Sequence, residues 1–259
     1  MRITEISSAQ NPRYKSWLKL LDGRGIKKQE TALIAGRKVL GEFLQQFPER
    51  VLGVILKKTE DAAGLPLPEG CPIYLLPYEL FARLDIYGIQ EPLLLVSAPP
   101  PPEWDGSLAH GLTAFLPFQN PINLGTTIRS AAAFGASVVL LHEAATPYLP
   151  KCLRASGPAI FQIPLFRGPG LGQLAACDLP IFALSPRGEN LFDFPFAAYP
   201  GIGLVAGMEG PGLDAYWPEE KRLSIPMAPN VESLNASVAM SIAMACRLAS
   251  ISQDAGGRL

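Results

Sequence analysis

Six short apolar runs between residues 112 and 227 constrain the fold of this chain more than any other feature. The runs are LTAFLPF, SVVLLH, AIFQIPLF, IFALS, GIGLVAG and RLSIPM. In most of them apolar residues follow one another without the apolar–polar alternation of a strand that has one exposed face. A strand of this kind is buried on both faces, which is typical of a parallel sheet covered by helices. Segments with helix-like spacing separate the runs. We therefore predict an α/β domain over 108–259, with a mostly parallel sheet flanked by helices.

A proline-rich stretch, SAPPPPEWDG, precedes this domain. Four consecutive prolines favour a stiff extended connector, and we predict a linker over 97–107. Upstream, TALIA, VLGVILK, PIYLL and PLLLVSA read as strands that alternate with helical stretches near 37–46 and 78–84. A further helix is expected from Pro12, capped by Asn11 and ended by Gly23. We predict a smaller α/β domain over 1–96.

The composition is that of a soluble globular protein, with 48% hydrophobic and 17% charged residues. The sequence shows neither an apolar run long enough for a membrane span nor a secretion signal, so a cytoplasmic location is expected. Four cysteines form no CxxC pair and have two histidines as companions. Reduced thiols are expected and a metal site is not. A GxSxG elbow is missing, which argues against a hydrolytic triad.

Charge is distributed unevenly along the chain. Residues 1–38 contain nine Lys/Arg and three acidic residues, a balance of +6, although the net charge of the whole chain is −1. From residue 97 onward, nine basic residues face twelve acidic ones, a balance of −3. The two ends of the chain are therefore expected to meet different partners. A solvated basic face is the alternative explanation for the first 38 residues.

Polar residues follow three of the apolar runs, where an open parallel sheet places its ligand site. The first segment, QNPINLGTTIRS, offers Asn123 and Arg129 around a helix start, where free N–H groups suit an anion. The second, MEGPGL, holds Glu209 in a glycine turn, and the third, APNVESLNASVAM, places Ser233 and Asn235 at the head of the last helix. Helix caps and an ordinary glycine loop are the structural alternatives.

Taken in order, NPINLGTTIRSAAAFG, LVAGMEGPGL and LSIPMAPNVESLNASVAM resemble the three motifs of the SpoU (TrmH-type) RNA ribose 2'-O-methyltransferases of the SPOUT superfamily. KCLRASGPAIF is similar to the segment between the first two motifs. The first domain resembles the L30e-like RNA-binding domain of rRNA-modifying members, through NPRYK, GRGIKK and LIAGRKVLGEFL. Ala35 stands where a Glu is common in the family, and Ala236 stands where a Val is common.

The resemblance implies a methyl donor, a fold and an assembly. S-adenosyl-L-methionine would be the cofactor, the last domain would contain a trefoil knot, and a homodimer would build the site across its subunit boundary. The RNA partner would be ribosomal RNA rather than transfer RNA, with neither a membrane nor a metal involved. The implied catalytic residues are Asn123, Arg129, Glu209, Ser233 and Asn235. The implied cofactor-binding residues are Gly207, Met208, Ile225, Met227, Leu234 and Ala236. The implied RNA-binding residues are Arg13, Lys15, Lys27, Lys28, Arg37, Lys38 and Arg154.

The implied chemistry needs few protein groups. A sulfonium methyl is already electrophilic, so the protein has to align the ribose hydroxyl and help to remove its proton. Arg129 either activates the hydroxyl or anchors a phosphate, and its pKa above about 12 favours anchoring. A tRNA 2'-O-methyltransferase and a catalytically silent RNA-binding paralogue are the alternatives. A nucleotide-dependent oxidoreductase is disfavoured by the glycine spacing G-x-G-x-x-x-G.

Overall fold

The structure is a computed structural model that describes residues 2–60, 64–108, 110–207, 213 and 217–254. The chain divides into two compact units. The first contains Met1–Pro100 and Thr146–Pro158, and the second contains Pro101–Ala145 and Ala159–Leu259. The segment 146–158 therefore groups with the first unit, whereas the sequence analysis places it in the second domain.

The first unit is built on a five-stranded sheet with the order β1-β4-β3-β5-β2. β1, β4 and β3 run parallel, and β5 runs antiparallel to β3 and β2. The four predicted strands and both predicted central helices are present, while β1 and α2 were not predicted. The strands are β1 (Arg2–Glu5), β2 (Thr31–Ala35), β3 (Val51–Lys57), β4 (Pro72–Leu76) and β5 (Leu93–Ser97). The helices are α1 (Pro12–Leu18), α2 (Gly23–Gln29), α3 (Arg37–Gln46), α4 (Tyr78–Leu84) and α6 (Pro150–Ser156).

Helix α1 starts as the sequence predicts but ends earlier. The Asn11 side chain accepts hydrogen bonds from Arg13 N and Tyr14 N, which caps the helix. The chain then passes through a 3-10 turn over Lys19–Leu21 and restarts as α2 at Gly23. The restart has a local cause, because Asp22 Oδ1 accepts from Arg24 N at 2.8 Å. The expectation that Gly23 ends the first helix is therefore wrong.

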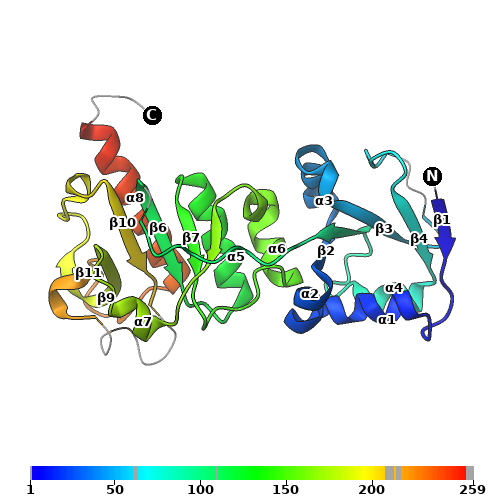
Figure 1. The fold of residues 1–259 in the computed structure, drawn as a ribbon, viewed down its shortest axis with the longest axis horizontal. Coiled ribbons are helices and arrows are strands. Elements are labelled where there is room, and N and C mark those ends of the chain that lie inside the picture. Colours follow the sequence, from blue (N-terminus) through cyan, green and yellow to red (C-terminus); the bar gives the residue numbers. More distant parts are fainter. Residues whose placement is uncertain (1, 61–63, 109, 208–212, 214–216, 255–259) are drawn as a thin grey trace. The chain divides into compact units, whose positions relative to one another are not determined.

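The second unit contains a six-stranded sheet, entirely parallel, with the order β11-β9-β10-β6-β7-β8 (Figure 1). This confirms the α/β class with a parallel sheet flanked by helices. The strands are β6 (Gly111–Leu116), β7 (Ser137–Leu140), β8 (Leu165–Arg167), β9 (Ile181–Asn190), β10 (Gly201–Val205) and β11 (Arg222–Ser224). The helices are α5 (Pro121–Ala133), α7 (Leu171–Ala175) and α8 (Ala236–Asp254). Of the apolar run 159–166, only its end is a strand, because Gly157–Phe161 forms a 3-10 helix.

Strand register explains why these runs are apolar throughout. Phe115 is paired with Val139 and Val205, and all three belong to the buried cluster on which Leu171 and Leu174 of α7 pack. Their neighbours in the strands point to the opposite face, as Ala114, Val138 and Leu204 do, and these are also fully buried. Both faces of the sheet are therefore covered.

Helices α5 and α8 pack against each other within the second unit. A hydrogen bond of 2.8 Å joins Ser241 Oγ of α8 to Ser130 Oγ of α5. The buried side of α8 is a stripe at helical spacing that includes Met240, Ala243 and Met244. The final helix is thus held by packing along its body, which leaves its polar head available for another role.

The predicted linker 97–107 is divided between the units, since Ser97 ends β5 and the part from Pro101 onward is anchored within the second unit. Arg167 N donates to Pro102 O at 2.8 Å, and Trp104 N donates to Arg167 O at 2.7 Å. The Arg167 guanidinium also pairs with Glu103 at 2.7 Å. Proline has no backbone N–H group and cannot donate a hydrogen bond in a central strand. This segment accordingly lies along β8, a strand at the edge of the sheet.

Candidate active site

The three strands that precede the polar segments are parallel, so their carboxyl ends lie at the same end of the sheet; residues 208–212 of the second segment lie outside the described part of the chain. The first follows β6, the second follows β10 and the third follows β11. β10 and β6 are neighbours, whereas β9 and β10 separate β11 from β6. The third segment must therefore cross this edge to reach the first, and a ligand bound there would meet loops that are far apart in the chain.

One hydrogen bond shows that the first and third segments meet. Asn235 Nδ2 donates to Asn123 Oδ1 at 3.2 Å, although 112 positions separate the two residues. The Oδ1 atom of Asn235 accepts from Ser237 N at 2.9 Å and from Ser237 Oγ at 2.6 Å, and so caps α8. Asn235 is therefore both a helix cap and a link between the two segments.

Asn123 is not a helix cap. Asn120 caps α5 through a hydrogen bond of 2.9 Å from Ile122 N, and Pro121 is the first helical residue. Asn123 is the third residue of the helix, within its first turn, and is 9% exposed. The alternative explanation of Asn123 as a capping residue is therefore wrong. Asn123 is instead a buried amide that is hydrogen-bonded to Asn235.

Arg129 lies on a different side of α5 from Asn123. Six residues correspond to about 240° around a helix and about 9 Å along it. Asn123 is buried, whereas Arg129 is exposed and forms no ion pair within the described part of the chain. A helix that began just after Asn123 would have let both side chains share one rim, but α5 begins at Pro121. The spacing on α5 thus places Arg129 and Asn123 on different sides of the helix, and the catalytic role of Arg129 stays a prediction.

The predicted cofactor residues follow β10 and β11. Gly207 comes two residues after β10 and is half-buried, and an added Cβ there would lie 3.5 Å from Leu184 O. Four others lie in or next to the segment after β11 and are half-buried, namely Ile225, Met227, Leu234 and Ala236. Ser233, predicted to be catalytic, lies in the same segment and is exposed. Met208 and Glu209 lie outside the described residues.

The predicted RNA-binding residues are exposed and belong to four helices of the first unit. Helices α1, α2 and α3 carry Arg13, Lys15, Lys27, Lys28, Arg37 and Lys38. Arg154 lies on α6, and its guanidinium carbon is 4.2 Å from the centre of the Tyr87 ring. Tyr87 was not predicted, because nothing in its local sequence marks it. Ala35, where the family commonly has Glu, ends β2 and is half-buried.

The cysteines of the structure are free thiols. Cys152 on α6 is fully buried, and this burial raises the pKa of its thiol far above the ordinary value. In the described part of the chain, no group of three or more His, Cys, Asp or Glu side chains is placed to hold a metal ion. Likewise, none of the helices described there has the length and apolar character needed to cross a membrane.

Comparison with known proteins identifies relatives along most of the chain. The chain is 42% identical over 247 residues to Ribosomal RNA small subunit methyltransferase G 2 of Syntrophobacter fumaroxidans, covering 93% of this chain. It spans about half of that relative, 48% of its length. It is also 28% identical over 252 residues to the 23S rRNA (guanosine(2553)-2'-O)-methyltransferase RlmP of Bacillus subtilis, covering 92% of this chain and 96% of the relative.

A solved structure shares the fold over both units. The SpoU methyltransferase AviRb of Streptomyces viridochromogenes, in complex with AdoMet, matches with a TM-score of 0.76 and 24% identity, over 96% of this chain and 100% of that chain. The model of the SpoU rRNA Methylase family matches residues 114–245, which contain all three polar segments. The chain therefore belongs to the SpoU rRNA methylase family.

Proposed function

We propose that this protein transfers a methyl group from S-adenosyl-L-methionine to a ribose 2'-hydroxyl of structured RNA, most specifically ribosomal RNA. The observation that carries the proposal is the hydrogen bond between Asn235 and Asn123, which joins the third polar segment to the first. Family membership supports methyl transfer to RNA, and the 2'-O-methyltransferase activity named for the Bacillus subtilis relative supports the ribose hydroxyl as acceptor.

The residues after β10 and β11 fit this cofactor. Ile225, Met227 and Leu234 supply half-buried apolar side chains, which suit an adenine ring, and Gly207 leaves its backbone accessible. These residues would hold the cofactor in loops that we propose to be knotted. When bound, S-adenosyl-L-methionine supplies an electrophilic methyl group, so the protein needs to orient the acceptor rather than to form a covalent intermediate.

The polar residues then have distinct roles. Asn123 and Asn235 form a fixed amide pair, and Asn235 is held by its cap of α8, so the pair can orient the ribose with little loss of entropy. Ser233 and Glu209 complete this proposed site. Arg129 anchors a phosphate next to the acceptor or draws the proton from the hydroxyl, and its constant positive charge favours the first role.

Arg129 reaches this site from a second copy of the chain in our proposal. It shares the exposed side of α5 with Ile122, which is 52% exposed. At the head of α8, Val238 is 47% exposed. Exposed apolar side chains on both helices suit a contact between two copies. A homodimer formed there brings Arg129 of one copy toward the Asn123–Asn235 pair of the other.

The proposal is tested with two variants, separately and mixed. Arg129→Ala and Asn235→Ser should each bind S-adenosyl-L-methionine by calorimetry but transfer little labelled methyl to total RNA. Unfolding and refolding the two together should restore transfer, because mixed dimers contain one complete site. Activity in Arg129→Ala alone refutes its role, and a mixture as inactive as its components refutes the shared site.

A further inference from the structure

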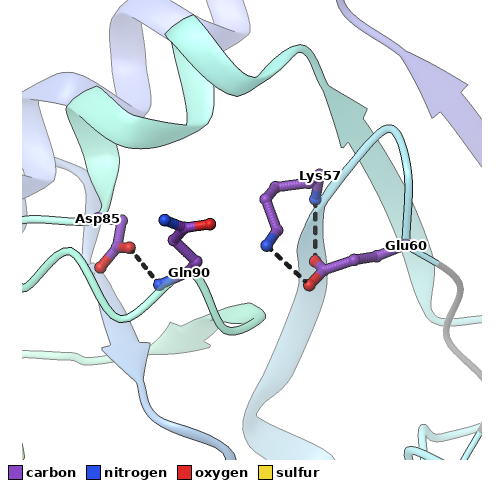
Figure 2. A network of polar contacts seen from close by, with 4 residues as sticks. All are labelled: Lys57, Glu60, Asp85 and Gln90. Carbon is purple, nitrogen blue, oxygen red and sulfur yellow. Dashed lines mark hydrogen bonds and ion pairs between the residues drawn. The ribbon is translucent and has the colours of Figure 1, made fainter.

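The loop between α4 and β5 is held in a defined conformation. Figure 2 shows the carboxylate of Asp85 beside the backbone of Gln90, and its Oδ2 atom accepts from Gln90 N at 2.7 Å. Gln90 has a φ of 55°, which is uncommon for a residue other than glycine. Such a conformation costs energy and persists where its surroundings enforce it. The Asp85–Gln90 bond therefore fixes the short loop that displays Tyr87.

Tyr87 and Arg154 form a cation–π pair on the first unit. The Arg154 guanidinium carbon lies 4.2 Å from the centre of the Tyr87 ring, while Arg154 remains exposed. The Tyr87 hydroxyl is buried and has no hydrogen-bond partner among the described residues. The Tyr87 hydroxyl is thus buried in the protein, while the Tyr87 ring contacts the guanidinium group of an exposed residue.

This pair stands next to other cations. Lys151 is exposed and lies one turn before Arg154 on α6. The loop also touches the start of α3, because Glu91 Oε2 accepts from Arg37 N at 2.6 Å, and Lys38 follows. Arg37 and Lys38 are both exposed and lie in the first turn of α3.

Two acidic residues near this pair each accept a backbone hydrogen bond. Asp85 is 4% exposed and accepts from Gln90, and Glu91 caps α3. Among the described residues, none forms an ion pair with Arg154. The surface made by the loop, α3 and α6 therefore presents exposed cationic residues, Arg154 among them, which fit a nucleic acid.

We propose that Tyr87 and Arg154 form a platform on which an unpaired base of the RNA substrate stacks. Single-stranded bases are recognised by stacking on guanidinium planes and aromatic rings, and the flanking lysines and Arg37 would contact phosphates. This inference rests on the proposed RNA-methylating function and deepens it, because it assigns the platform a preference for RNA loops over continuous duplex.

The test uses a hairpin RNA with 2-aminopurine in its loop and the same hairpin with an abasic site at that position. The wild-type protein should quench the fluorescence and bind the first hairpin on the order of 10-fold more tightly than the second. Tyr87→Leu and Arg154→Lys should lose this preference, since one lacks the ring and the other keeps the charge without the plane. Tyr87→Phe should retain it.

Lys151→Ala is the matched control, because it removes a charge from the same helix but no stacking plane. It should weaken binding of both hairpins equally. Equal binding of the two hairpins by the wild-type protein, or an undiminished preference in Arg154→Lys, overturns the platform. Methyl transfer by the wild-type protein to ribosomal RNA is measured in parallel. Failure there with an intact loop preference counts against the proposed function alone.

Discussion

At the scale of single residues, Asn235 does two things that substitutions can separate. Its Oδ1 caps α8, and its Nδ2 donates to Asn123. Asn235→Ala should lose both, with a fall in the free energy of unfolding of about 1 kcal/mol, the usual value of an N-cap. Asn235→Ser should keep the cap, and with it nearly all the stability, but lose the bond to Asn123. Thermal unfolding and methyl transfer measure the two effects independently. Full activity in Asn235→Ser would show that the amide pair is dispensable.

Tyr87 gives a second prediction, this one on stability and pH. Burial raises the pKa of Tyr87 to about 12 from its ordinary value of 10.0, with Arg154 opposing the shift. Between these values the unfolded chain loses the phenolic proton and the folded chain keeps it, so stability falls as the pH rises. Tyr87→Phe lacks this loss and should be about 1 kcal/mol more stable at neutral pH, because it removes a buried unpaired hydroxyl. Denaturant unfolding at neutral pH and near pH 11 checks both effects. If the free energy of unfolding changed with pH in the same way in the wild-type protein and in Tyr87→Phe, the raised pKa of Tyr87 would be contradicted.

From sequence, the position of a side chain could be predicted where it follows a strand, while its catalytic role stays a prediction. Asn123 and Asn235 were expected at one edge because parallel strands end together, and they are hydrogen-bonded there. The same reasoning could not place Arg129 relative to Asn123, because it did not show whether the helix begins before or after Asn123. Tyr87 was missed because its significance comes from Arg154, which is 67 positions away.

At the scale of elements, Gly203 lies within β10 and Gly207 follows it, and an added side chain would meet different surroundings at the two positions. An added Cβ at Gly203 would lie 2.8 Å from side-chain atoms of both Ile181 and Phe115, so Gly203→Ala should cost about 1–3 kcal/mol through overpacking. At Gly207 the nearest atom is Leu184 O at 3.5 Å, an ordinary contact. Gly207→Ala should therefore fold normally and bind S-adenosyl-L-methionine more weakly, by calorimetry. Unchanged binding would remove Gly207 from the proposed cofactor site.

Secondary-structure elements could be predicted where the sequence contains a clearly apolar run. The runs that became β2 to β5 and most strands of the second unit are apolar enough to be recognised, whereas β1 is a four-residue edge strand in which Ile3 is 61% exposed. Helix α2 was missed because GRGIKKQ has two glycines and one large apolar residue. The start of α2 depends on the Asp22 cap, and one capping side chain is a weak signal in a sequence.

At the scale of the whole molecule, the chain passes between the two units three times. These passages lie near residues 100, 145 and 158, because the segment Thr146–Pro158 belongs to the first unit. Tyr148, Cys152 and Leu153 of this segment are buried. Sequence alone could not reveal this, since a short helix with buried apolar residues looks the same whichever unit covers it. The expected linker at 97–107 is therefore not the sole connection.

The central claim concerns the position of the methyl group on the RNA. Ribosomal RNA methylated by this protein with labelled S-adenosyl-L-methionine should be digested with alkali and its products separated. A methylated 2'-oxygen cannot attack the neighbouring phosphate, so the account predicts label in alkali-resistant dinucleotides, and none with Arg129→Ala. Label released in mononucleotides would place the methyl group on a base and contradict the account.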